Sequence, residues 1–81
     1  MYAVVLADSA KKQLQKLERS VQERIVATLE RIRARPETFV RRLVGEQTYR
    51  LRVGDYRVII DLQRELLVIL VIEVSKREDA Y

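Results

Sequence analysis

The sequence contains no cysteine and no histidine, and these absences remove several kinds of chemistry at the outset. Without cysteine there is no disulfide bond, no thiol nucleophile and no thiolate zinc site. Without histidine there is no imidazole to act as a general base near neutral pH. The carboxylates follow no known metal-ligand spacing, so neither a metal nor a cofactor is expected.

Long hydrophobic segments are also missing. The longest apolar run, 66–72, is far too short to cross a bilayer as a helix, and the N-terminus lacks the basic and apolar regions of a signal peptide. We therefore expect a soluble, cytoplasmic protein with no membrane partner. No Gly/Ser linker, repeat or low-complexity segment interrupts the 81 residues, which predicts a single domain over residues 1–81.

The composition is that of a small folded domain with a basic surface. Hydrophobic residues make up 48% and charged residues 35%, enough for a compact core and a charged exterior. Sixteen Lys and Arg against twelve Asp and Glu give a net charge of +4, which makes an anionic partner plausible. Because the excess is small, the local arrangement of the cations matters more than their total.

The first half of the chain has the pattern of one strand followed by two helices. Residues 2–6 form a short apolar run typical of a strand, and Asp8 or Ser9 is expected to cap the helix that follows. Ser20-Val21-Gln22-Glu23 has the form of a capping box and predicts the start of a second helix, which should end near Arg35 because Pro36 follows. Its expected buried stripe is Val21, Ile25, Leu29 and Ile32.

The second half changes to the period-two pattern of strands. Residues 36–48 are expected to form a connector, with Phe39, Val40, Leu43 and Val44 as its anchors. Two strands then flank Gly54-Asp55, which fits a two-residue type II′ turn. After a turn at 63–65, residues 66–74 are apolar at nearly every position, as in a strand buried on both faces. The order β-α-α-β-β-β predicts an α+β fold in which a helical hairpin packs on one face of a small antiparallel sheet.

A turn at Gly54-Asp55 sets the register of the hairpin. Val53 then pairs with Tyr56 and Arg52 with Arg57, and both strands agree on which face is apolar. That face carries Tyr49, Leu51, Val53, Tyr56, Val58 and Ile60, and it should pack against the helices. The opposite face carries Arg50, Arg52, Arg57, Ile59 and Asp61.

Three arginines on one face allow two interpretations. Like charges directly opposite on a sheet cost up to about 1 kcal/mol, and Arg52 facing Arg57 is such a pair. Either the guanidinium groups spread into solvent near Asp55, Asp61 or Glu73, or they form an anion site. Arginine stays charged and presents a planar fork of donors that suits phosphate.

The C-terminal residues add to the second interpretation. A final strand that runs antiparallel to its predecessor returns to the end of the sheet that holds the Gly54-Asp55 turn. Lys76, Arg77 and Tyr81 then lie within reach of Arg52 and Arg57. A basic pocket with one phenol ring suits RNA, because the ring can stack on a base while the cations hold phosphates.

The motif "YRLRVGDYRVII", an apolar strand and the ending "KREDAY" together resemble the RelE toxin family of bacterial and archaeal toxin–antitoxin systems, over almost the whole chain. The resemblance implies a fold close to that of small microbial ribonucleases. It also implies cleavage of mRNA in the ribosomal A site, which halts translation. The partners implied are the ribosome and mRNA, a helical antitoxin similar to RelB, and operator DNA contacted through the toxin–antitoxin complex.

The resemblance also assigns roles to residues. Arg50 and Arg52 match the paired basic positions of the family hairpin, Arg57 and Arg77 match arginines that stabilise the transition state, and Tyr81 matches the C-terminal tyrosine. Lys76 stands where many relatives have histidine and is expected to help bind RNA. Arginine does not deprotonate in proteins, so the general base stays open: Lys76 or Tyr81 can act only with a depressed pKa.

Two other functions are compatible with the same residues. The ParE branch shares the fold but inhibits DNA gyrase by binding, without RNA cleavage. Alternatively, the chain is a basic module without toxicity that acts only within a DNA-binding repressor complex. The combination of Arg57, Arg77 and Tyr81 favours the RelE interpretation.

Overall fold

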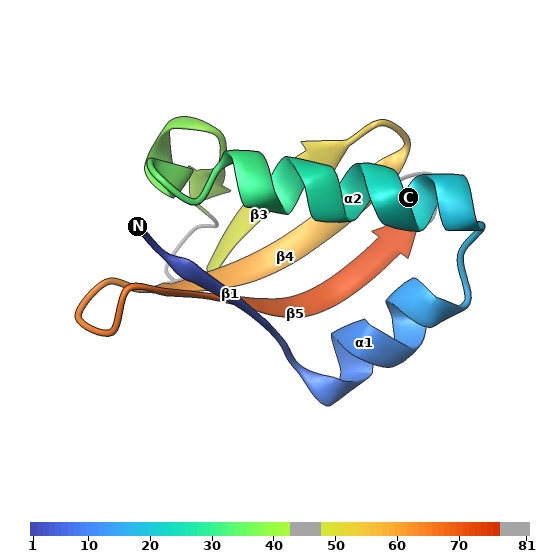
Figure 1. The fold of residues 1–81 in the computed structure, drawn as a ribbon, viewed down its shortest axis with the longest axis horizontal. Coiled ribbons are helices and arrows are strands. Elements are labelled where there is room, and N and C mark those ends of the chain that lie inside the picture. Colours follow the sequence, from blue (N-terminus) through green and yellow to red (C-terminus); the bar gives the residue numbers. More distant parts are fainter. Residues whose placement is uncertain (43–47, 77–81) are drawn as a thin grey trace.

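The structure, a computed structural model, describes residues 1–42 and 48–76 (Figure 1). The expected anchors Leu43 and Val44 lie outside the described residues. The elements are β1 (Ala3–Leu6), α1 (Asp8–Gln15), α2 (Arg19–Arg31), the 3₁₀ helix η1 (Pro36–Thr38), β2 (Arg41–Arg42), β3 (Thr48–Val53), β4 (Tyr56–Gln63) and β5 (Val68–Lys76). In the described part of the chain, no helix is long and apolar enough to cross a bilayer.

The strands form one sheet in the order β1-β5-β4-β3-β2, and the predicted α+β class and order of elements are confirmed. All neighbours are antiparallel except β1 and β5, whose register pairs Ala3 with Val68 and Leu6 with Val71 in parallel. The sheet is therefore mixed rather than purely antiparallel. This pairing could not be read from the sequence, because β1 is separated from β5 by the entire remainder of the fold.

Both helices contribute to one core on a single face of the sheet (Figure 1). The fully buried side chains include Ile25 and Ile32 of the helical layer and Val58, Ile60, Ile69 and Val71 of the sheet. The predicted stripe of α2 is confirmed, with Ile25, Leu29 and Ile32 buried and Val21 packed against the core. Burying this much apolar surface is the main source of stability in such a small domain.

The predicted helix starts are wrong by one or two residues. Ala7 is the N-cap of α1, and Ser9 lies inside the first turn, where its hydroxyl donates to the Ile72 carbonyl at 3.0 Å instead of capping. Glu18 is the N-cap of α2 without a side-chain bond, so Ser20 and Glu23 form no capping box. The Gln22 amide donates to the Leu17 carbonyl at 2.7 Å and fixes the short connection between the helices.

The connector after α2 is more structured than expected. The helix ends at Arg31, and Pro36 opens η1, which suits a residue without an N–H group. Val40 packs against the core, but Phe39 is 49% exposed and is not an anchor. The Tyr2 hydroxyl donates to a Glu37 carboxylate oxygen at 3.2 Å; partial removal from water and this carboxylate raise the pKa of Tyr2 above its ordinary value.

β5 departs from the prediction in its start and its burial. It begins at Val68, because residues 64–67 form the turn, where Leu67 adopts a φ of 54°. Only its helix-facing residues Ile69, Val71 and Val74 are buried, so the strand is not buried on both faces. Ile60 pairs with Val71 whereas Ile59 pairs with Glu73, which leaves Ile72 as the extra residue of a β-bulge.

α1 covers the edge of β5 beyond the end of β1. The Val74 N–H donates to Gln13 Oε1 at 2.7 Å, and the Ile72 carbonyl accepts the hydrogen bond from Ser9. β1 pairs with β5 only as far as Val71, so these side chains satisfy backbone groups that no strand reaches. The bulged end of β5 is thereby fixed beside the β3–β4 turn.

Candidate functional site on the arginine face

The β3–β4 hairpin has the register predicted from the sequence. Every predicted pair is present, from Val53 with Tyr56 to Tyr49 with Ile60, and Arg52 lies directly opposite Arg57. Gly54 adopts a φ of 57°, as the first central position of a type II′ turn requires. The apolar set of side chains faces the helices, as expected: Leu51, Val53, Val58 and Ile60 are buried, and Tyr49 and Tyr56 pack against the core.

Arg50, Arg52 and Arg57 therefore lie on the face of the sheet that carries no helix; we call these three residues the arginine face. Arg52 is exposed, and Arg50 and Arg57 are half-buried. β2 pairs Arg41 with Arg50, so a fourth arginine occupies the adjoining register position. The short turn and the paired strands hold these positions at fixed spacing.

Asp55, Asp61 and Glu73, the described carboxylates nearest the arginine face, form no ion pair with it. Among residues 1–42 and 48–76, the ion pairs are Arg19 with Glu23 and Arg33 with Glu30, both on the helical side. Asp61 instead accepts from Gln63 at 3.4 Å, and Glu73 accepts from the Ser75 hydroxyl at 3.3 Å. The expectation that Asp55, Asp61 or Glu73 relieves the arginines is therefore not met by an ion pair in the described structure.

Ser75, and not Lys76, lies beside Arg57. β4 and β5 pair Arg57 with Ser75 and Tyr56 with Lys76, and paired residues project from the same face. Because Tyr56 packs against the core, Lys76 starts from the helix-covered face. Lys76 thus lies at the end of the sheet that holds the β3–β4 turn, as expected, and its role in RNA binding stays a prediction.

The bulge decides which side chains of β5 share the arginine face. Without the extra residue at Ile72, alternation from Val71 would direct Glu73 into the core and Val74 to the outside. With it, Val74 is 5% exposed and Glu73 lies on the outer face opposite Ile59. Glu73 was expected near the arginines, whereas Ser75 was not, because nothing in "LLVILVIEV" marks where the strand bulges.

Arg24 of α2 is a further cation at this end of the molecule. Its guanidinium lies against Gly54, where a Cβ atom would meet Nη1 at 3.1 Å. Because glycine has no Cβ atom, Gly54 permits both the positive φ and the close approach of Arg24. Cations therefore reach the turn from the helical layer as well as from the strands.

The arrangement is suited to an extended anion. Guanidinium groups on a rigid sheet that form no ion pair with a carboxylate of residues 1–42 or 48–76 can donate to successive phosphate oxygens. Arg50, Arg52 and Arg57 are brought together as predicted, whereas Arg77 and Tyr81 lie outside the described residues.

The comparisons with known proteins identify the family. Residues 4–81 match the family described as ParE toxin of type II toxin-antitoxin system, parDE. The chain belongs to the RelE/ParE superfamily of toxins. No curated protein sequence matches this toxin significantly.

Solved structures of RelE proteins resemble this RelE/ParE toxin over nearly its whole length. RelE of the Pyrococcus horikoshii RelE–RelB complex is 30% identical, with a TM-score of 0.82 over 98% of both chains. RelE of the Escherichia coli RelBE complex is 28% identical, with a TM-score of 0.79 over 94% of this chain and 96% of that one. The RelBE2 complex of Mycobacterium tuberculosis shares the fold, with 23% identity, a TM-score of 0.86 and coverage of 94% and 98%.

Proposed function

We propose that this toxin is a ribosome-dependent endoribonuclease that cleaves mRNA in the A site and so stops translation. The observation that carries the proposal is the arginine face: Arg52 and Arg57 lie directly opposite each other and pair with no carboxylate of the described residues. A fold that holds like charges together at a cost gains from an anion that binds between them. The similarity to RelE chains at 28% and 30% identity supports RNA as that anion.

The proposed reaction is a transesterification within the mRNA backbone. The ribose 2′-oxygen forms a bond to the adjacent phosphorus, its proton passes to a base, and the bond to the 5′-oxygen breaks as that oxygen takes up a proton. Arg57 and Arg77 stabilise the additional negative charge on the phosphate in the transition state. Arg50 and Arg52 hold the RNA backbone, and Tyr81 stacks on or orients a base.

The source of the base separates this chain from enzymes that use histidine. The sequence contains no histidine, and arginine stays protonated. Lys76 or Tyr81 can therefore act as the general base only if its pKa falls. Positioning by the ribosome contributes much of the remaining rate acceleration. It holds the 2′-oxygen in line with the phosphorus, so this alignment does not have to be reached by chance at an entropic cost. Primer extension with Arg77→Ala and Tyr81→Ala should show loss of the cuts made by the wild type; persistence of the cuts in both variants rejects these roles.

The partners and setting follow from this function. A cell that carries the toxin needs an antitoxin, and the similar Escherichia coli and Pyrococcus horikoshii RelE chains were solved with RelB. We expect a largely helical antitoxin similar to RelB that masks the toxin, with operator DNA contacted through the complex. The ribosome and mRNA as targets place the toxin in the cytoplasm, acting as one domain over residues 1–81.

The second candidate is inhibition of DNA gyrase, and the family match supports it, because the matched family is named for ParE. Incorporation of labelled methionine and thymidine after induction distinguishes the two. Rapid loss of methionine incorporation with continued thymidine incorporation is the expected result. Early loss of thymidine incorporation would instead establish a ParE-like toxin. A chain that affects neither label would be the module without toxicity, and both proposals would fail.

A further inference from the structure

The register of the sheet places Glu73 beside the arginines on the outer face. Across β3, β4 and β5, the row nearest the β3–β4 turn consists of Arg52, Arg57 and Ser75, and the next row consists of Arg50, Ile59 and Glu73. Glu73 is therefore a diagonal neighbour of Arg57 on the adjoining strand. Diagonal neighbours lie about 7–8 Å apart, a distance that long side chains can span. A phosphate held by Arg57 thus leaves the ribose next to it within reach of the Glu73 carboxylate.

The Ser75 hydroxyl orients the Glu73 carboxylate toward the row of the paired arginines. Ser75 Oγ donates to Glu73 Oε2 at 3.3 Å, and Ser75 lies directly opposite Arg57. Among residues 1–42 and 48–76, no arginine forms an ion pair with Glu73. A carboxylate has about four acceptor positions, so the single hydrogen bond from Ser75 leaves Glu73 able to accept from a ribose hydroxyl.

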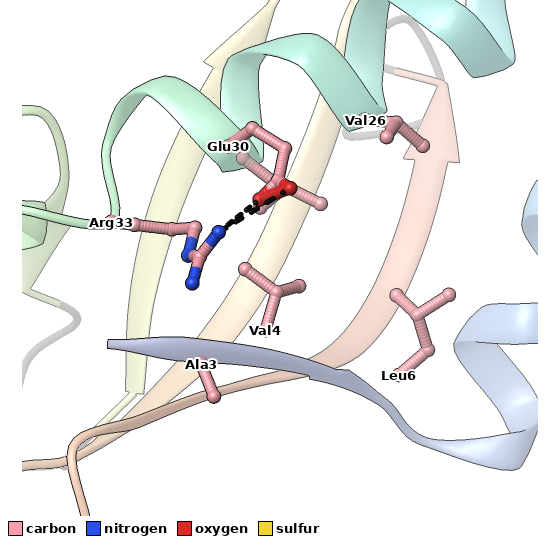
Figure 2. Close-up of a pocket in the computed structure, with 7 residues that line it drawn as sticks. Ala3, Val4, Leu6, Val26, Glu30 and Arg33 are labelled. Atoms are coloured by element: carbon pink, nitrogen blue, oxygen red, sulfur yellow. Dashed lines mark hydrogen bonds and ion pairs between the residues drawn. The ribbon is translucent and has the colours of Figure 1, made fainter. Parts of the chain in front are cut away.

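Other described carboxylates are less well placed for contact with RNA on this face. Glu30 Oε2 lies 3.0 Å from Arg33 Nη1 beside β1, on the side of the sheet that the helices cover (Figure 2). Asp61 shares the outer face, but it lies four residues from Arg57 along β4, which is about 13 Å. Glu73 therefore combines the correct face with a short distance to the arginine pair.

A carboxylate supplies the one chemical group that the arginine face lacks. Cleavage by a ribose 2′-hydroxyl needs a group that accepts its proton, and arginine only donates. The chain contains no histidine that could accept this proton. Glutamate side chains are ionised at neutral pH, whereas lysine and tyrosine side chains ordinarily carry their protons there. A glutamate beside the phosphate site can therefore accept the proton without a change in its surroundings.

We propose that Glu73 is the general base of the cleavage reaction. The 2′-oxygen forms a bond to the adjacent phosphorus while its proton passes to a carboxylate oxygen of Glu73. The bond from phosphorus to the 5′-oxygen breaks, the 5′-oxygen takes up a proton from water, and Glu73 afterwards returns its proton to the solvent. The products are a 2′,3′-cyclic phosphate and a 5′-hydroxyl group. This inference rests on the proposed function, since it names a further residue of that reaction.

Neutralising Glu73 separates this role from simple charge balance. A carboxylate that only moderates the positive charge of the arginine face weakens RNA binding, so its removal would strengthen binding and leave cleavage at least as fast. Removal of a general base has a different result, because cleavage slows although binding does not weaken. The two roles therefore predict opposite changes in the rate of cleavage.

Glu73→Gln is the direct test, measured on ribosomes stalled with a defined codon in the A site. Excess toxin gives the single-turnover rate of cleavage, and an mRNA with 2′-O-methyl riboses, which cannot be cleaved, gives the affinity. Glu73→Gln should lower the rate by at least about a hundredfold and weaken binding by less than about twofold. The controls Asp55→Asn and Asp61→Asn remove the other two carboxylates near the arginine face and should lower the rate by less than about threefold.

The pH dependence of cleavage gives a second measurement that a merely structural effect would not change. The residual cleavage by Glu73→Gln should increase more steeply with pH than cleavage by the wild type, because hydroxide must then take the proton in place of the carboxylate. A rate lowered by the same factor at every pH would show a structural effect and overturn the inference.

The remaining outcomes separate failure of the inference from failure of the proposed function. If the wild type cuts mRNA on the ribosome and Glu73→Gln cuts it at the same rate, the inference alone fails. Equal losses in Glu73→Gln and both controls would also overturn it, because the effect would then belong to the charge of the face as a whole. If the wild type makes no cut on the ribosome, the proposed function fails and the inference fails with it.

Discussion

Arg52 and Arg57 lie directly opposite each other on the exposed face of the sheet, and neither forms an ion pair with a described carboxylate. Such a pair weakens the hairpin that carries it, because two cations are held together in the absence of an anion. The fold therefore retains an arrangement that is unfavourable for stability alone. A phosphate bound between the two guanidinium groups would replace their repulsion by a net attraction.

Arg57→Gln should consequently separate stability from activity. Removing one charge of the pair should leave the free energy of unfolding unchanged or raise it by up to about 1 kcal/mol. RNA cleavage should fall by about a hundredfold, the usual effect of removing one donor to a transition-state oxyanion. Urea denaturation and cleavage rates measure the two effects. Arg31→Gln, at an exposed position of α2, is the control and should change neither; a clear loss of stability in Arg57→Gln would show a structural role.

Gly54→Ala should destabilise the toxin by about 1–2 kcal/mol, because alanine is strained at a φ of 57°. The added Cβ would also approach Arg24 Nη1 to 3.1 Å, but that group ends a flexible side chain and can move. The cost measured by urea denaturation should therefore be nearly the same in an Arg24→Ala background. If Gly54→Ala causes no loss of stability in the Arg24→Ala background, the destabilisation comes from the contact with Arg24 and not from backbone strain.

Gln13→Leu should loosen the end of β5 beside the arginine face. It leaves the half-buried Val74 N–H without the acceptor that now lies 2.7 Å away, at a cost of about 1–3 kcal/mol. Exchange of the Val74 amide should become faster, while Gln13→Glu, which keeps an acceptor oxygen at this place, should preserve protection. Equal exchange in the wild type and Gln13→Leu would show that α1 does not hold this edge.

The β4–β5 turn allows a matched test of backbone strain. Leu67 has a φ of 54° and Leu66 does not have a positive φ, and both side chains are exposed, by 47% and 71%. Leu67→Gly should raise the unfolding free energy by up to about 1 kcal/mol, since glycine accepts this conformation without strain. Leu66→Gly should lower it by about 0.5–1 kcal/mol through chain entropy. The same sign of change at both positions would contradict this assignment.

The β3–β4 hairpin was predictable from the sequence because two independent signals agreed. The Gly54-Asp55 turn set the register, and the alternation of apolar and basic residues on each strand pointed to the same faces. The core stripe of α2 was equally clear, since Ile25, Leu29 and Ile32 recur at the helical period. These features are local, and short-range patterns determine them.

The features that sequence analysis missed depend on contacts between distant elements. The parallel pairing of β1 with β5 joins the two ends of the fold, and the Ile72 bulge is accommodated by Ser9 and Gln13 of α1. The bulge also sets the face on which each later residue of β5 lies, because one extra residue reverses the faces of everything that follows it. Ser9 bonds across to β5 rather than capping its own helix, a choice that depends on tertiary structure.

Primer extension on an mRNA during translation in a reconstituted system tests the central claim most directly, with the wild type compared with Arg57→Gln and Arg31→Gln. The account predicts cuts by the wild type and by Arg31→Gln that require translating ribosomes, and loss of those cuts in Arg57→Gln. Cuts of equal strength in Arg57→Gln, or cuts that form without ribosomes, would contradict it.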